Sequence, residues 1–313
     1  MKAQLLSATL LAAFSGVLSA ADQQLLNLLM PDAKIIAGIN VEQAKGTQFG
    51  QYVLNQIQTQ DAEMQKLVTL TGFDPRRDVR EVLVASDGNV QSKMGLGLAR
   101  GNFDVAKITA AATAHGAATE IYNGVTILTE PKGKDGIAFL DSTIVVAGDI
   151  ASVKGAIDRQ HTAQPLSAAI LVKINQWSNA QDAWAISTVP PTSLAPVTKD
   201  AQPNPMMATA SSVQAAAGGV KFGANVVFNG EAVTDTAQNA TTLGDLVKFM
   251  INLAQMQGPQ NPEVKALANS VTVNASGTVL KISASLPQET FTKMMEPAKK
   301  ATIGLHPAPA ARR

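Results

Sequence analysis

The sequence predicts an α+β protein in which antiparallel sheets are faced by helices, and an internal match suggests two related halves. Short runs rich in Val, Ile and Leu are separated by tight-turn dipeptides, of which Asn123-Gly124 is the clearest, and helical apolar stripes follow several of these hairpins. Hairpins pair their strands antiparallel, and an amphipathic helix must bury its apolar stripe against such a sheet.

The N-terminal half alternates apolar strands with helices. A helix is expected where Phe49, Val53, Leu54 and Ile57 recur at helical spacing. Asp87-Gly88 and Asn123-Gly124 predict hairpin turns. Strands are expected at 33–40, 79–86, 94–100, 118–122, 125–129, 136–140, 143–147 and 182–187, and further helices at 104–115 with Asn102 as N-cap, from Asp149 to Arg159 and over 166–174.

The C-terminal half begins after a proline-rich segment. Prolines 190, 191, 196, 203 and 205 prevent regular structure, so 189–207 is predicted to be a linker or loop. Beyond it, Asn229-Gly230 is expected to turn a hairpin between 220–228 and 232–236. A helix capped by Thr241 or Thr242 should end at Met256, followed by a helix at 262–268, a hairpin of 271–275 and 279–286, and a helix at 287–300.

The first residues predict export. Lys2 is followed by an apolar run of about 14 residues, shorter than the roughly 20 that a membrane-spanning helix needs, and Ser19-Ala20-Ala21 is a small-x-small cleavage site before Asp22. We therefore expect a periplasmic or secreted protein with no membrane span after cleavage. The expected segments are a signal peptide at 1–21, an α+β subdomain at 22–188, the linker at 189–207, a second α+β subdomain at 208–300 and a disordered tail at 301–313.

A sparse internal match suggests duplication. Val82-x-Val84-x3-Gly88-x-Val90 has the same spacing as Val271-x-Val273-x3-Gly277-x-Val279, and each hairpin leads into a helix. Any two strand-turn-strand-helix units share such positions, so common origin and coincidence both remain open.

Composition excludes several classes of site. The chain has 25 Lys and Arg against 24 Asp and Glu, which gives no basic excess for binding nucleic acid. It has no Cys and three scattered His, so thiol chemistry, a lipidated Cys and common metal sites lack their ligands. We expect no cofactor and no metal.

Candidate ligand-binding residues are few, and each also has a structural interpretation. Arg76, Arg77 and Arg80 could bind an anionic group, although the neighbouring acids Asp74, Asp78 and Glu81 can neutralise them locally, which the pattern favours. Trp177 and Trp184 could contact a ligand, but core packing is the favoured role. No residue is singled out as catalytic.

The sequence resembles a known group of exported proteins. The resemblance lies in Pro31-Asp-Ala-Lys34, Gly72-Phe-Asp-Pro-Arg-Arg-Asp-Val-Arg-Glu81, Ala99-Arg-Gly-x-Phe103, Ala138-Phe-Leu-Asp141 and Ala156-Ile-Asp-Arg159. These motifs are similar to those of uncharacterised exported proteins of acidobacteria-type bacteria, over most of the mature chain. The resemblance implies export and a two-part α+β fold, and assigns no activity.

Three functions remain open. The first is a non-enzymatic module that binds an envelope protein or another envelope component. The second is a carrier of a small apolar ligand or lipid, suggested by apolar stretches such as Phe249-Met-Ile-Asn-Leu253, which core packing would equally explain. The third is a hydrolase that uses a carboxylate pair, either Asp74 with Asp78 or Asp141 with Asp149.

Overall fold

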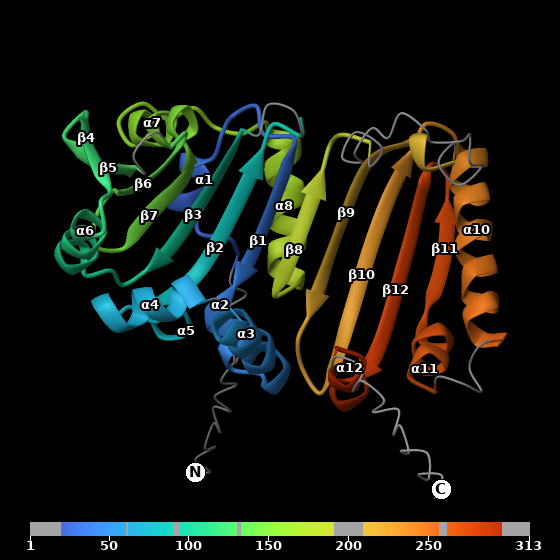
Figure 1. The fold of residues 1–313 in the computed structure, drawn as a ribbon. Coiled ribbons are helices and arrows are strands. Elements are labelled where there is room, and N and C mark those ends of the chain that lie inside the picture. Colours follow the sequence, from blue (N-terminus) through green and yellow to red (C-terminus); the bar gives the residue numbers. More distant parts are fainter. Residues whose placement is uncertain are drawn as a thin grey trace, which may run out of the picture.

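Twelve strands form one antiparallel sheet in the computed structural model (Figure 1). The structure describes residues 20–60, 62–89, 94–129, 133–190, 209–256 and 262–295. The strand order is β11-β12-β10-β9-β8-β1-β2-β3-β7-β6-β5-β4. The strands are β1 (Ile35–Asn40), β2 (Val79–Ser86), β3 (Gly95–Gly101), β4 (Ala118–Tyr122), β5 (Val125–Thr129), β6 (Asp135–Phe139), β7 (Ile144–Asp149), β8 (Ala183–Ser187), β9 (Val213–Lys221), β10 (Asn225–Thr234), β11 (Thr272–Ser276) and β12 (Val279–Pro287).

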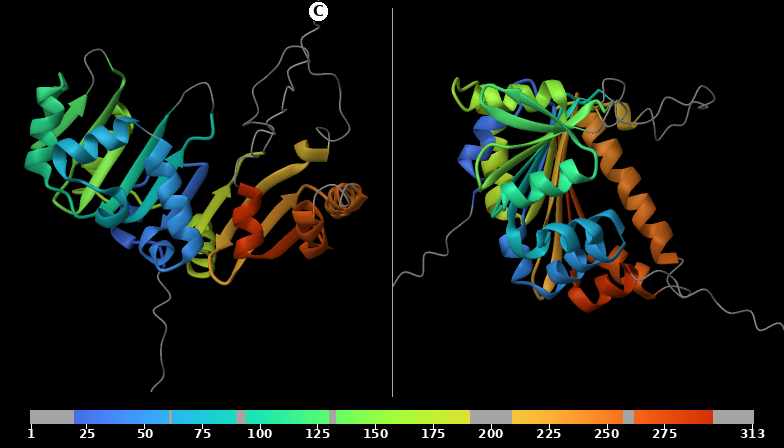
Figure 2. Two further views of the ribbon diagram at one scale, coloured as in Figure 1. Left: turned by 60° about the horizontal axis from the view of Figure 1, so that its bottom comes forward. Right: turned by 60° about the vertical axis from the view of Figure 1, so that its left-hand side comes forward.

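Helices pack on both faces of this sheet, which confirms the predicted α+β class (Figures 1 and 2). One face carries α1 (Gln23–Leu28), α7 (Ile150–Arg159) and α8 (Ala168–Ala180). The opposite face, on the concave side of the curved sheet, carries α2 (Val41–Lys45), α3 (Gln48–Gln60), α4 (Ala62–Thr71), α5 (Pro75–Asp78), α6 (Val105–Ala114), α10 (Ala237–Met256), α11 (Pro262–Ser270) and α12 (Gln288–Met295).

The larger core lies under α1, α7 and α8. Leu25 of α1, Ile157 of α7 and Ile174 of α8 are fully buried against Leu83 and Val146 of the sheet. Alternate strand residues face this core because side chains on a strand alternate between its two faces. A smaller cluster on the opposite face is built on Val41, Val79 and Phe103.

The two halves of the chain meet at β8 and β9. These strands pair from Ala183 opposite Val220 to Ser187 opposite Ala216. Asp182, which is 2% exposed, fixes the end of this ladder. Its carboxylate accepts hydrogen bonds from Lys221 Nζ at 2.6 Å and the Phe222 amide at 2.5 Å, and its carbonyl accepts one from the Asn40 amide at 2.8 Å.

Aromatic contacts join the halves on the concave face. The Phe49 ring of α3 lies 4.9 Å from the Phe291 ring of α12 and 5.2 Å from the Phe222 ring between the centroids. Phe291 also packs against Phe228 of β10. Edge-to-face geometry stabilises such pairs beyond their buried area, so these rings link segments far apart in sequence.

The hairpin turn expected at Asn123-Gly124 forms. Asn123 and Gly124 have φ values of 47° and 80°, as a two-residue hairpin turn of this kind requires. Gly88 and Gly277 also have positive φ, at 76° and 56°. The predicted turn at Asn229-Gly230 is wrong, because both residues lie inside β10, opposite Gly219 and Gly218 of β9. The real turn lies between Lys221 and Asn225, where it reverses the long strands β9 and β10.

Three helix boundaries differ from those predicted. The N-cap of α6 is Asp104, whose carboxylate accepts from the Lys107 amide at 3.1 Å, so the expectation of Asn102 is wrong. Helix α10 begins at Ala237, and Thr241 and Thr242 lie inside it with their hydroxyls bonded to carbonyls one turn earlier. Helix α8 continues six residues beyond Ile174, so it includes Trp177.

Several expectations concern residues outside the described ranges. The predicted signal peptide (1–21) and linker (189–207) fall almost wholly on residues that the structure does not describe, and the predicted tail (301–313) falls wholly on such residues. The duplication stays a prediction. In the first hairpin, β2–β3, the first strand β2 pairs with β1, whereas in the second hairpin, β11–β12, it is the second strand β12 that pairs with β10. The two hairpins therefore do not occupy equivalent positions in the sheet.

Close packing at Gly38 gives a stability prediction. A Cβ at Gly38 would lie 2.7 Å from both Leu83 Cδ2 and Trp184 Cζ2, whereas a Cβ at Gly230 would find its nearest atoms at 4.0 Å. Gly38→Ala should lower the free energy of unfolding by about 1–3 kcal/mol through overpacking. Gly230→Ala, the matched control, should change it by about 0.5 kcal/mol or less. Urea unfolding followed by circular dichroism measures both, and equal effects would contradict the packing described.

Candidate functional site

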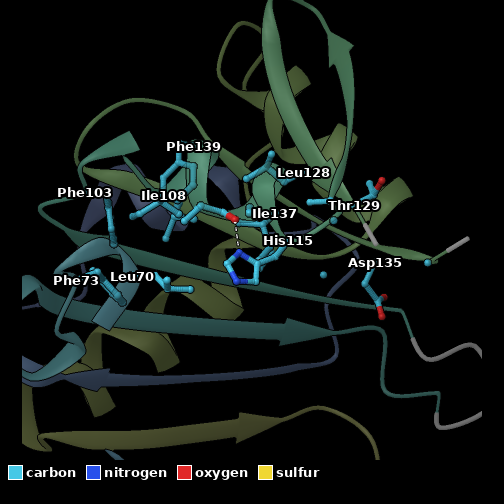
Figure 3. A pocket seen from close by; sticks show the side chains of 18 residues that line it. Leu70, Phe73, Phe103, Ile108, His115, Leu128, Thr129, Asp135, Ile137 and Phe139 are labelled. Atoms are coloured by element: carbon cyan, nitrogen blue, oxygen red, sulfur yellow. Dashed lines mark hydrogen bonds between the residues drawn. The ribbon is translucent and has the colours of Figure 1, made fainter. Parts of the chain in front are cut away.

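The main cavity of the described residues lies between α4, α6 and strands β5–β7, with a volume of about 850 Å³ (Figure 3). Its lining is predominantly apolar, and Leu70 and Ile137, which are 48% and 45% exposed, open it to solvent. The labelled lining residues are Leu70, Phe73, Phe103, Ile108, His115, Leu128, Thr129, Asp135, Ile137 and Phe139.

Small residues on both walls keep this cavity open. The α6 wall presents Ala111 and Ala112, and no residue of α6 is fully buried. The sheet wall presents Gly136 and Gly148. Gly148 has a φ of 154°, and a Cβ there would clash with the Gly95 carbonyl oxygen. Between the larger apolar residues of the lining, the small side chains of Ala111 and Ala112 and the glycines of the sheet leave the space unfilled.

Aromatic rings close one end of the cavity. The Phe103 ring lies 5.7 Å from the Phe73 ring and 5.6 Å from the Phe139 ring between centroids. Phe103 itself is 7% exposed and belongs to the smaller core cluster. This end is thus a fixed wall built from three elements, continuous with the core.

The polar side chains of His115, Asp135 and Thr129 line the same cavity (Figure 3). His115 is the C-cap residue of α6, and its Nδ1 lies 2.8 Å from the Ala111 carbonyl oxygen. A carbonyl can only accept, so Nδ1 carries the proton and Nε2 is left as the second polar atom of the ring. An apolar space with a few polar groups at its edge is the usual composition of a small-molecule site.

A second, polar hollow of about 450 Å³ adjoins the cavity and shares Phe73 and Phe103 with it. Its charged residues are Arg77, Asp78, Asp104 and Lys107. Arg77 pairs with Asp78 at 2.7 Å and Lys107 with Asp104 at 2.9 Å. The charges of this hollow are therefore balanced within it.

The three candidate arginines lie near this hollow but do not converge on a common point. Arg76 donates to Asp74 at 2.9 Å and to Asn55 at 2.9 Å. Arg77 also donates to the Gly72 carbonyl at 2.7 Å, and Arg80 Nη2 lies 3.5 Å from Asn102 Oδ1. Local acids hold Arg76 and Arg77, which is the arrangement that the sequence pattern favoured. The guanidinium groups of Arg76 and Arg77 therefore donate to these acids and are not directed together at a site for an anion from solution.

The carboxylate pairs considered for hydrolysis serve local structure. Hydrogen bonds from Arg76 lower the pKa of Asp74, and those from Arg77 lower the pKa of Asp78. Burial alone would raise the pKa of Asp141 and Asp149, but hydrogen bonds from Thr143 and Ser152 respectively outweigh it, and both pKa values are lowered. A general acid needs a raised pKa, so these pairs offer no proton donor at neutral pH.

Both tryptophans belong to the larger core. Trp177 of α8 and Trp184 of β8 are 7% and 6% exposed. Trp184 covers Gly38 of the neighbouring strand, and neither ring lines the main cavity. Their contacts are those of core packing.

The apolar stretch in the C-terminal half lies on the surface of α10, at the end of the sheet away from the cavity (Figure 1). Phe249, Leu253 and Met256 recur at helical spacing and are 64%, 47% and 78% exposed. Met250 beside them is 50% exposed. These side chains neither fill a core nor line the main cavity, so they form a separate apolar surface, named here the α10 stripe.

Sequence reasoning missed the cavity. It placed His115 at the end of a helix and attached no functional role to His115, Ala111 or Asp135. The available signal was the run Ala110–Ala112 in α6, of which Ala111 and Ala112 line the cavity, where large apolar residues would be expected if the helix packed closely on the sheet.

Neither a metal site nor a membrane span is found in the part of the chain that the structure describes. Across those ranges His, Asp and Glu do not gather in threes that could hold an ion. No helix within them is long and apolar enough to cross a bilayer.

Comparison with known proteins identifies a fold relative. No protein-family model and no curated protein matches the chain. Crystal form III of a protein named TP0453 is similar with a TM-score of 0.57 at 11% identity, over 86% of this chain and 96% of that one. Crystal form IV of TP0453 gives 0.53 at 11% identity, over 87% and 96%. At such identity the likeness establishes the fold alone: this chain has the α+β architecture seen in TP0453.

Proposed function

We propose that this protein is an exported, non-enzymatic binding protein that takes a small apolar molecule, or the apolar part of an envelope lipid, into the cavity under α6. The observation that carries the proposal is a cavity of about 850 Å³ whose walls are apolar and whose opening exposes Leu70 and Ile137. Volumes of roughly 300–1,000 Å³ are typical of ligand pockets.

The energetics of the cavity support a ligand. An apolar space open to water leaves its lining hydrated, and burying that lining against a ligand gains about 25 cal/mol per Å² of apolar surface. Two features make the site selective for apolar compounds: the aromatic wall of Phe73, Phe103 and Phe139 is rigid, and polar groups are confined to His115, Asp135 and Thr129. A ligand with one polar end fits this distribution.

Filling the cavity from its helix wall tests the proposal. Ala112 lines the cavity, whereas Ala110 on the same helix is exposed and does not. Ala112→Trp should weaken binding of the neutral fluorescent probe N-phenyl-1-naphthylamine at least tenfold, because the new ring occupies the space that the probe needs. Ala110→Trp, the matched control, should leave the probe's Kd unchanged. Fluorescence titration gives both constants.

Native mass spectrometry of freshly purified protein completes this test. We expect a bound apolar molecule that is retained by Ala110→Trp and lost from Ala112→Trp. Equal probe affinity in the two variants, or no binding in either the variants or the wild type, would contradict the proposal. Circular dichroism of each variant confirms that the fold is kept.

A second candidate function is recognition of an envelope protein through the α10 stripe. Phe249, Leu253 and Met256 recur at helical spacing on α10 and are exposed, with Met250 exposed beside them. Contiguous exposed apolar side chains mark protein interaction sites more often than scattered ones do. The stripe is remote from the cavity (Figure 1), so binding at one site is separable from binding at the other.

A variant of the stripe tests this second function. Phe249→Ser combined with Leu253→Ser should abolish recovery of a specific partner from envelope fractions, because it removes the apolar contact surface while leaving the cavity intact. The control is Thr241→Ser combined with Lys248→Gln on the same helix, both at exposed positions. Recovery of the same protein by both double variants would exclude the stripe, and recovery of no protein by the wild type would count against the function.

A further inference from the structure

The backbone nitrogen of Asp22 points directly at a carboxylate. The Asp22 amide donates to both oxygens of Glu81, at 3.1 and 3.2 Å. Glu81 lies on β2 and is partly buried, and it is separated from Asp22 by 59 positions in the sequence. One neutral N–H satisfies a carboxylate poorly, because the two oxygens, which share a negative charge, must share a single donor.

Residue 22 is fixed in this position by other contacts. The Asp22 carboxylate accepts from Arg100 at 2.9 and 3.1 Å, and it caps α1 by accepting from the amides of Gln24 and Leu25 at 2.8 and 3.1 Å. Arg100 is itself anchored on Thr143 at 2.9 Å. These contacts hold residue 22 in place, so the fold itself directs the Asp22 nitrogen at Glu81.

The cluster lacks one positive charge. Two carboxylates, those of Asp22 and Glu81, meet a single guanidinium, that of Arg100, which is committed to Asp22. Burial raises the pKa of Glu81 to about 7, and the nearby Asp22 charge also raises it. The Asp22 amide and the Arg100 charge lower it, but not enough to offset burial.

The sequence places a cleavage site next to this nitrogen. Ser19-Ala20-Ala21 has small residues at the positions that a signal peptidase reads, and Asp22 follows. Hydrolysis of the Ala21–Asp22 peptide bond adds hydroxide from water to the Ala21 carbonyl and a proton to the Asp22 nitrogen. At neutral pH that amine takes up a further proton from solvent and becomes an ammonium group, which carries three donors where the amide carried one.

We propose that Asp22 is the first residue of the mature protein and that its α-ammonium group forms an ion pair with Glu81. Cleavage then supplies the positive charge that the cluster lacks, and Glu81 on β2 binds the new N-terminus of its own chain. This proposal rests on the predicted export signal and is independent of what the cavity binds.

The neighbouring peptide bond provides a contrast. Cleavage between Ala20 and Ala21 would leave the ammonium group on Ala21, which is 8% exposed and whose nitrogen lies 3.2 Å from the Ser178 hydroxyl. A buried ammonium with one neutral partner is costly, whereas one beside Glu81 has a carboxylate within hydrogen-bond distance. The folded structure therefore favours a chain that begins at Asp22.

Processing should move the pH range over which this site loses stability to higher pH. Before cleavage, the raised pKa of Glu81 means that the folded chain loses stability as pH rises from about 4.5 to 7. After cleavage, the ion pair lowers the pKa of Glu81 and raises that of the α-amino group above its ordinary value of about 7.7–8.0. A raised amine pKa gives stability that is complete below about pH 8 and is lost as pH rises through the folded pKa. The charged groups facing the pair are Asp22 and Arg100.

A two-by-two comparison tests the ion pair. One chain begins at Asp22 and the other at Ala20, where residue 22 keeps a neutral amide, and each is made with Glu81 and with Glu81→Gln. At pH 7 the Asp22 start should raise the midpoint of thermal unfolding by about 2–4 °C relative to the Ala20 start when Glu81 is present. This gain should vanish in Glu81→Gln. Glu42→Gln, which removes an exposed acid paired with Lys45, should leave the gain intact.

Two direct measurements complete the test. The intact mass of the full chain after export should correspond to a protein beginning at Asp22, and a start at another residue would overturn the assignment. The pKa of the α-amino group, measured from the pH dependence of its acylation rate, should lie above 8 in the wild type and return to about 8 or below in Glu81→Gln. An equal amine pKa in the two proteins would overturn the ion pair, even if both are stable.

Discussion

The pairing of β8 with β9 is the interaction on which the rest of the structure depends. It joins the two halves of the chain into one sheet, and Asp182 secures it by binding Lys221, the Phe222 amide and the Asn40 amide at once. The buried carboxylate of Asp182, a residue only 2% exposed, is tolerated because Lys221 Nζ and the Phe222 amide both donate to it, while the Asn40 amide donates to the Asp182 backbone carbonyl. Without this junction, the aromatic contact between Phe49 and Phe291 would not form.

The fold class could be predicted from the sequence because its signals are local. Asn123-Gly124 requires positive φ at both positions, and Asp149 caps α7 by accepting from the Ser152 amide, as the sequence predicts. The error at Asn229-Gly230 shows the limit of such signals. There the long ladder between β9 and β10 holds both residues extended, and pairing on two sides outweighs the local turn preference. The early start of α10 has a similar cause, because Thr236 accepts from the Asn239 amide and begins the helix one turn before the expected caps.

The candidate site could not be predicted in the same way, because the cavity lies between two surfaces that come from segments far apart in the sequence. The alanines of α6 and the glycines of β6 and β7 are separated by the hairpin of β4 and β5, and each is unremarkable alone. The charged residues that the sequence did highlight, Arg76 and Arg77, are held by acids adjacent to them. Their prominence in the sequence reflects the short capped helix α5, whose N-cap is Asp74. The charged residues that stood out in the sequence thus form a structural turn, and the alanines that did not stand out line the main cavity.

The glycine floor of the cavity limits how its shape can evolve. At Gly148 any side chain would meet the Gly95 carbonyl, so this part of the sheet wall cannot be built up without disturbing strand pairing. The helix wall has no such restriction, because Ala111 and Ala112 project from a helix that is not fully buried. Homologous chains that accept smaller or larger molecules would be expected to differ along α6 while retaining the same strands. Ligand preference in this architecture would then diverge through single substitutions on one helix, at little cost to the sheet.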